Sequence, residues 1–252
     1  MSTLYTFGCS FTEEFERVPK YEGGNGGLTP IWAYIEMHLD GKVPKTWSKL
    51  LSEKLEFDVK NYGEGGKSNM TIFENFIHNL DEITSDDIVI INWTGISRFK
   101  WAYDDNFVTI LPNTPPYGDG EINESTKEEI LINKSDEIWK SEIYNFIKII
   151  NKLSDLIGFE VFYWSIDDTI INSESDDFRN DRRYLLGDCT IDDGNPFSVF
   201  RVLHDFGAKP IYEETNKQVI DHHFGKQGHE VIADLFYQHI KKIKIDRKAL
   251  YS

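Results

Sequence analysis

A serine, a histidine and an aspartate occupy positions in this sequence from which they could act together on an acyl carbonyl. Ser10 lies in "FGCSFT", directly after an apolar N-terminal run. A serine attacks a carbonyl carbon only when a base removes its proton. His223 can be that base at neutral pH, and Asp221 on the same loop, "DHHFGKQG", can orient its imidazole. These residue types predict nucleophilic acyl transfer.

The same reaction needs hydrogen-bond donors where negative charge develops on the carbonyl oxygen. The segment "NYGEGGKSN" contains Gly63, Gly65 and Gly66, whose backbone N–H groups can approach a substrate without interference from a Cβ atom. A polar side chain in "INWTGISR" offers a further donor. The glycine segment lacks the G-x-G-x-x-G spacing of a dinucleotide site, so we expect no nucleotide cofactor there.

Each of these segments also has a plainer interpretation. A serine between a strand and a helix is commonly a helix cap, and glycines are common in ordinary turns. The C-terminal loop could simply be solvated, or it could bind a metal ion through side chains of the types that zinc prefers: Asp221, His222, His223 and His229. Neighbouring side chains of an extended chain point to opposite sides, which argues against the metal site.

Alternating strands and helices must position these residues. Apolar runs predict strands over residues 3–8, 57–63, 87–94 and 159–167. Helical periodicity predicts helices over residues 46–55, 69–80, 135–158 and 226–243, with Thr46 as the N-cap of the first. This alternation is typical of right-handed βαβ units. We therefore expect an α/β fold, a three-layer α/β/α sandwich with a mostly parallel sheet, in which ligands bind beyond the carboxyl ends of the strands.

The length of 252 residues suits one domain, and we expect residues 1–252 to form a single domain with insertions. Three segments interrupt the alternation, near residues 18–45, 99–133 and 167–210. The first is too glycine-rich for a regular element, and the second is expected to be a long loop or a small hairpin. Loops of such length are usually functional or mobile, and these could cover a substrate cleft.

The composition excludes several classes of partner. A formal net charge of −16 repels phosphate backbones and anionic membrane surfaces, so we expect no nucleic-acid or membrane partner. The N-terminal residues lack the basic and apolar regions of a signal peptide, and no apolar stretch has the length of a membrane span. A cytoplasmic location is therefore expected. Cys9 and Cys189 are too few for a disulfide framework or a zinc site.

Together these segments resemble the sequence blocks of the SGNH (GDSL-type) hydrolases. "FGCSFT" is similar to the first block, with Ser10 as the nucleophile and Cys9 where aspartate is usual. "NYGEGGKSN" is similar to the second block and places the oxyanion glycine at Gly66. "DHHFGKQGHEVIADLF" is similar to the last block, with His223 as the base. The blocks follow the family's order across nearly the whole chain.

The sequence departs from the family pattern at two places. The third block usually has an asparagine where Thr94 stands here. The third oxyanion donor is therefore one of three side chains: Thr94, Asn92 or Asn69. The last block usually reads Asp-x-x-His, whereas only one residue separates Asp221 from His223. This shortened spacing leaves His222 as an alternative base.

The resemblance implies a serine-dependent ester hydrolase that acts on small acyl esters, such as O-acetyl groups of carbohydrates. It implies an oxyanion hole made by the N–H groups of Ser10 and Gly66 and the third donor, with no metal ion and no organic cofactor. The expected partner is a small-molecule or carbohydrate ester substrate. Two other functions stay open. One is a carbohydrate- or partner-binding module with weak or absent catalysis, and the other is a metal-dependent hydrolase using Asp221, His222 and His229.

Overall fold

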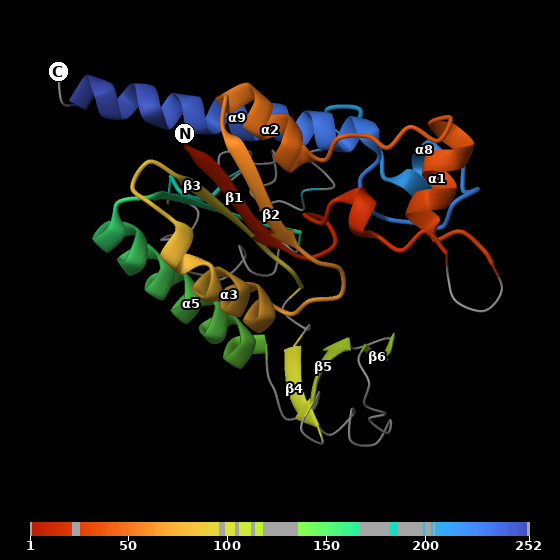
Figure 1. The fold of residues 1–252 in the computed structure, drawn as a ribbon, viewed down its shortest axis with the longest axis horizontal. Coiled ribbons are helices and arrows are strands. Elements are labelled where there is room, and N and C mark those ends of the chain that lie inside the picture. Colours follow the sequence, from red (N-terminus) through yellow and green to blue (C-terminus); the bar gives the residue numbers. More distant parts are fainter. Residues whose placement is uncertain are drawn as a thin grey trace.

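The main sheet has four strands, and within the described part of the chain all four are parallel, in the order β2-β1-β3-β7 (Figure 1). The computed structural model describes residues 2–21, 26–95, 99–103, 106–111, 114–117, 136–166, 182–185, 199, 203 and 205–250. The strands are β1 (Thr3–Gly8), β2 (Asp58–Gly63), β3 (Ile88–Trp93) and β7 (Glu160–Ser165). All four predicted strands are confirmed, with small differences at their ends.

Burial along the strands follows their hydrophobic pattern. Every residue of β3, a run that is apolar except for Asn92, is buried. All residues of β1 after Thr3 are also buried. Among the described strands, β2 pairs only with β1 and lies at the edge of the sheet. Its first four residues are alternately exposed and partly buried. These patterns are typical of central and edge strands of a sheet that is covered on both faces.

Helices cover both faces of this sheet and complete the predicted three-layer α/β/α sandwich (Figure 1). Helices α2 (Trp47–Leu55) and α9 (Lys226–Leu250) form one layer, and α3 (Asn69–His78) and α5 (Asp136–Ile157) form the other. The four predicted helices are confirmed, and α9 extends beyond its predicted end. Aromatic rings fill the space between the sheet and the α2–α9 layer, where Trp47, Trp164 and Phe236 meet edge to face with centroids 5.3–5.7 Å apart.

The strand order of this sheet reverses direction at β1. From β1 the chain passes to β2 on one side, and it then crosses to β3 on the other side of β1. In open parallel sheets, ligands bind beyond the carboxyl ends of the strands at such a reversal of strand order. The residues that follow β1 and β3 are therefore the first candidates for a functional site. They include Ser10 and Thr94.

The prediction for residues 18–45 was wrong, because this segment contains helix α1 (Pro30–His38). Pro30 stands in the first turn, where the missing N–H of proline costs nothing. The buried side of the helix packs in a second, smaller core, formed by Phe15, Ile31, Tyr34, Ile35, Ile211 and Val219. The glycine-rich run ends at Gly27 and therefore precedes the helix instead of replacing it.

The other insertions are described in part. A small antiparallel sheet occupies the beginning of the segment 99–133, as the hairpin alternative predicted, and residues 118–133 lie outside the described residues. Its strands are β4 (Phe99–Tyr103), β5 (Asn106–Leu111) and β6 (Thr114–Tyr117). Most of the segment 167–210 also lies outside the described residues. The described part of the chain also contains three short helices: η1 (Phe15–Arg17), η2 (Leu80–Glu82) and α8 (Ile211–Glu214).

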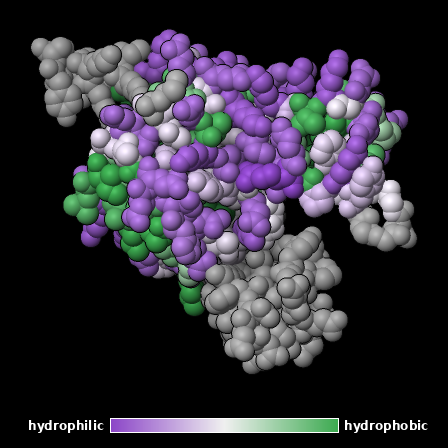
Figure 2. All heavy atoms as spheres, in the orientation of Figure 1, coloured by the Kyte–Doolittle hydropathy of each residue, from purple (hydrophilic) through white to green (hydrophobic). Residues whose placement is uncertain are grey.

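Hydrophilic residues cover most of the face shown in Figure 2, as a net charge of −16 leads one to expect. Exposed apolar side chains occur on the outer side of α5, at Ile138, Ile149 and Leu156. Within the described ranges, no helix has both the length and the apolar character needed to span a membrane.

Candidate active site

Ser10 lies in a tight turn directly beyond the carboxyl end of β1. The carbonyl oxygen of Cys9 accepts the N–H groups of Thr12 and Glu13, at 2.8 and 3.2 Å, so the chain coils as soon as the strand ends. This turn lies so close to β2 that a Cβ atom on Gly63 would be 2.5 Å from the backbone carbon of Thr12. Packing therefore fixes the backbone that carries Ser10.

The helix-cap interpretation of Ser10 does not fit the elements around it. The first helix after Ser10 is the short 3₁₀ helix η1, and the residue at its N-cap position is Glu14. The hydroxyl of Ser10 instead contacts a side chain from the distant C-terminal loop. The Ser10 side chain is therefore part of a tertiary contact.

The structure brings Ser10, His223 and Asp221 together, although Ser10 and His223 are 213 positions apart in the sequence. The Oγ atom of Ser10 lies 2.7 Å from Nε2 of His223. The other ring nitrogen of His223, Nδ1, lies 2.5 Å from Oδ1 of Asp221. The contacts run without a break from a carboxylate through an imidazole to a hydroxyl, which is the arrangement that lets histidine take a proton from serine.

The short spacing between Asp221 and His223 does not prevent this contact. Oδ1 of Asp221 also accepts the backbone N–H of His223, at 2.8 Å, so a single compact turn serves both hydrogen bonds. The start of α8 holds the loop from outside, because the N–H groups of Ile211 and Tyr212 donate to the carbonyl oxygens of His223 and Asp221. The ring of Phe11 packs on the imidazole of His223, with centroids 4.5 Å apart.

The charge state of Asp221 bears on which ring nitrogen of His223 donates a hydrogen bond. Burial alone raises the pKa of Asp221, but the hydrogen bonds and the charge of His223 outweigh it and hold the pKa below its usual value. An ionised carboxylate can only accept hydrogen bonds. The Nδ1 atom of His223 therefore donates to Asp221, and in the neutral ring Nε2 is left to accept the hydroxyl proton of Ser10.

The other two histidines of this region have different surroundings. His222 is exposed, and its ring lies against Tyr212 with centroids 5.4 Å apart. His229 is buried, and its Nδ1 accepts the backbone N–H of Trp47 at 3.1 Å. Burial, with a smaller contribution from the charge of His223, lowers the pKa of His229 to about 3. Among the described residues, no three His, Cys, Asp or Glu side chains are grouped closely enough to hold a metal ion.

Two backbone N–H groups of this region, those of Ser10 and Gly66, are available to a ligand. In the part of the chain that the structure describes, the N–H groups of Ser10 and Gly66 have no acceptor. Gly66 has φ of +74°, a conformation that glycine adopts far more readily than other residues. The preceding N–H group, that of Gly65, is not available, because Oε2 of Glu13 accepts it at 3.0 Å.

The three candidates for the third oxyanion donor differ in whether their polar atoms already make hydrogen bonds within the protein. The amide of Asn69 fixes the end of β3, since it accepts the N–H of Thr94 at 2.8 Å and donates to the carbonyl of Thr94 at 3.1 Å. Asn92 is buried, and its Oδ1 lies 3.3 Å from Sγ of Cys9. The hydroxyl of Thr94 is buried without a partner among the described residues. Of these three side chains, only that of Thr94 makes no hydrogen bond to a described residue.

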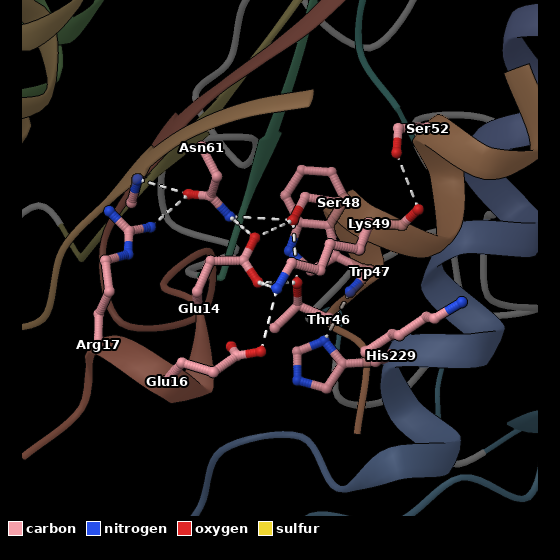
Figure 3. A network of polar contacts seen from close by, with 12 residues as sticks. Glu14, Glu16, Arg17, Thr46, Trp47, Ser48, Lys49, Ser52, Asn61 and His229 are labelled. Atoms are coloured by element: carbon pink, nitrogen blue, oxygen red, sulfur yellow. Dashed lines mark hydrogen bonds and ion pairs between the residues drawn. The ribbon is translucent and has the colours of Figure 1, made fainter. Parts of the chain in front are cut away.

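A buried polar cluster that the sequence patterns did not predict lies beside the Ser10 turn (Figure 3). The carboxylate of Glu14 accepts hydrogen bonds from Thr46 Oγ1, Ser48 Oγ and Asn61 Nδ2, at 2.8–3.0 Å. Lys49 forms an ion pair with the same carboxylate at 3.2 Å. We call these five residues the Glu14 cluster. It ties the turn after β1 to β2 and to the start of α2, and the adjacent glutamates in "SFTEEF" were its only sequence signal.

The cluster changes the expected capping of α2. Thr46 occupies the N-cap position, as predicted, but its side chain makes no capping hydrogen bond. Its hydroxyl donates to Glu14, and the buried His229 accepts the N–H of Trp47 in its place (Figure 3). A residue of the C-terminal helix α9 thus caps α2.

No protein-family model matches this sequence, and no curated protein matches it. Solved structures are similar in fold over nearly the whole chain. A protein described as lipolytic and of the G-D-S-L family, from Desulfitobacterium hafniense, covers 95% of this chain and 99% of its own, with 10% identity and a TM-score of 0.44. A member of the same family from Veillonella parvula covers 93% and 96%, with 13% identity and a TM-score of 0.36.

A catalytic mutant of an acetylxylan esterase from Geobacillus stearothermophilus is also similar. It covers 95% of this chain and 94% of its own, with 15% identity and a TM-score of 0.34. These likenesses concern the fold alone.

Proposed function

We propose that this protein is a serine-dependent ester hydrolase that works through an acyl-enzyme on Ser10. The observation that carries the proposal is the unbroken contact from Asp221 through His223 to the Ser10 hydroxyl. Ser10 is partly exposed, so a substrate can reach it. The available N–H groups of Ser10 and Gly66 supply donors for the oxyanion.

The reaction proceeds in two steps. Oγ of Ser10 bonds to the carbonyl carbon while Nε2 of His223 takes the hydroxyl proton, and the carbonyl oxygen becomes an oxyanion that the N–H groups of Ser10 and Gly66 and the hydroxyl of Thr94 bind. The intermediate then collapses, the bond to the leaving oxygen breaks, and His223 gives its proton to the departing alcohol. Water repeats the sequence on the acyl-enzyme, with His223 first as base and then as acid. The acid product leaves, and Ser10 is regenerated.

Each group in this scheme comes from the chain itself, and the scheme uses no metal ion or organic cofactor. We propose small neutral acyl esters as substrates, such as O-acetyl groups of carbohydrates. The support is the resemblance of the sequence blocks to the SGNH hydrolases and the net charge of −16, which disfavours the approach of anionic esters.

Replacement of the nucleophile tests this function. Ser10→Ala should lower kcat for an aryl acetate by at least about a thousandfold, because no other atom of the site can become acylated. A fluorophosphonate should label Ser10 of the wild type, as mass spectrometry of the peptide would show. Circular dichroism should show the same fold in both proteins. A purified Ser10→Ala variant that hydrolyses the ester at the wild-type rate would contradict the proposal.

Two further results would favour the alternatives. Activity that disappears with a chelator and returns with zinc would favour the metal-dependent hydrolase. A folded wild type that binds acetylated oligosaccharides without cleaving them, and that leaves Ser10 unlabelled, would favour the binding module.

A further inference from the structure

The loop between β2 and α3 carries the N–H group of Gly66, and its backbone is anchored one residue after another. The N–H groups of Gly63 and Glu64 are held by acceptors in β2 and β1, at 2.7 and 3.0 Å. The N–H group of Gly65 is held by Oε2 of Glu13 at 3.0 Å. The N–H group of Gly66 comes next and has no acceptor among the described residues. Glu13 is therefore the last anchor before this donor.

Glu13 is itself held in place on the turn that carries Ser10. Its backbone N–H donates to the carbonyl of Cys9, and a Cβ atom on Gly63 would lie only 2.7 Å from its backbone nitrogen. A Cβ atom on Gly65 would lie 2.9 Å from Oε2 of Glu13 and 3.8 Å from Cβ of Ser10. The nucleophile, the carboxylate and the glycine loop are therefore close neighbours.

We propose that Glu13 is a positioning residue for the oxyanion hole. By holding the N–H of Gly65, its carboxylate orients the following peptide unit, which carries the N–H of Gly66. The inference rests on the function proposed above, because Gly66 serves catalysis only if an oxyanion forms on Ser10.

The acceptor oxygen of Glu13 and its negative charge have opposite effects on this site. The oxygen orients the donor, whereas a negative charge so close to Ser10 opposes the formation of an oxyanion. Burial raises the pKa of Glu13, and the negative charge of Glu64 raises it further. The hydrogen bond from Gly65 and the charges of Arg17 and His223 lower it, but the resulting pKa of Glu13 still lies above its usual value. A neutral side chain with the same acceptor should therefore serve the site at least as well.

Two substitutions separate these effects. Glu13→Ala removes the acceptor, and kcat for a neutral aryl acetate should fall by about tenfold to a hundredfold. KM should change little, because the N–H of Gly66 binds the oxyanion of the transition state and not the ground-state ester. Glu13→Gln keeps an acceptor oxygen without the charge, and its kcat should equal or exceed that of the wild type. Glu16→Ala removes an exposed glutamate from the same segment and should leave kcat unchanged. A wild-type kcat in Glu13→Ala, or equal losses in Glu13→Ala and Glu13→Gln, would overturn the inference.

The contact can also be measured without turnover. In ¹⁵N-labelled protein, Glu13→Ala should shift the amide resonances of Gly65 and Gly66 and speed hydrogen exchange at the Gly65 N–H, and Glu13→Gln should do so much less. Unchanged resonances in Glu13→Ala would overturn the contact itself. If the wild type hydrolyses no ester, the proposed function fails, and the catalytic role of Glu13 fails with it. The Gly65 amide resonance would still show whether the contact with Glu13 exists, because that measurement does not depend on turnover.

Discussion

The Glu14 cluster and the Ser10 site both include residues of the turn after β1, and they use their hydrogen bonds differently. In the Glu14 cluster, one buried carboxylate receives three neutral donors and an ammonium group from within the chain. At the Ser10 site, the N–H groups of Ser10 and Gly66 and the hydroxyl of Thr94 have no partner in the described part of the chain. A buried network with satisfied hydrogen bonds stabilises the fold, whereas unused donors beside a reactive side chain can serve a ligand.

His223 and His229 show the same contrast in a single residue type. His223 is partly exposed, and both of its ring nitrogens contact groups of the proposed mechanism. His229 is buried between the rings of Phe15 and Phe224 and accepts a backbone N–H, so it is held neutral. Burial and partners, and not residue type, distinguish the proposed base from the helix cap.

The largest expected effect comes from the proposed base. His223→Ala should lower kcat/KM for an aryl acetate by at least about a thousandfold, because the Ser10 proton then has no acceptor. His222→Ala is the matched control and should stay close to the wild type, because His222 is exposed and lies against Tyr212. Steady-state kinetics on both variants, with circular dichroism, would check this. Damage from His222→Ala with a mild His223→Ala would make His222 the base.

The next effect is on stability and comes from the Glu14 cluster. Glu14→Ala leaves several buried donors without an acceptor, and the free energy of unfolding should fall by about 2–4 kcal/mol. Glu14→Gln keeps an acceptor oxygen and should lose less. Urea unfolding would measure both, beside Ser10→Ala, which should unfold like the wild type. If Ser10→Ala proved the more destabilising change, the division between a structural cluster and a functional site would be wrong.

The last effect is on the pH dependence of stability and comes from His229. Because the pKa of His229 is about 3 in the folded protein and its ordinary value is 6.5, the unfolded chain takes up the proton first as the pH falls. This contribution to stability is complete above pH 6.5 and is lost toward pH 3, at up to about 1.4 kcal/mol per pH unit. His229→Gln cannot titrate, so its stability should fall less steeply with acid, whatever its value at pH 7. Urea unfolding at several pH values would show it, and parallel slopes would contradict the burial of a neutral His229.

The sequence determined the elements of this protein because local patterns of apolar residues report which face of a strand or helix is buried. The continuous run of β3, the alternation in β2 and the periodicity of α5 and α9 each predicted the right element. Residue chemistry then selected Ser10, His223 and Asp221 as candidates. Helix α1 was missed because much of its buried side packs on residues far away in the chain, including Ile211 and Val219, and no local pattern reports such a contact.

Only the tertiary structure decided which of the candidates meet. The sheet and its helix layers bring His223 to Ser10 across 213 positions, turn His222 outward, and bury His229 against the start of α2. The same packing places the carboxylate of Glu13 on the N–H of Gly65 and leaves the N–H of Gly66 without an acceptor among the described residues. Contacts of 2.7–3.1 Å between distant segments of the chain depend on how those segments pack, and the sequence of any single segment does not contain that information.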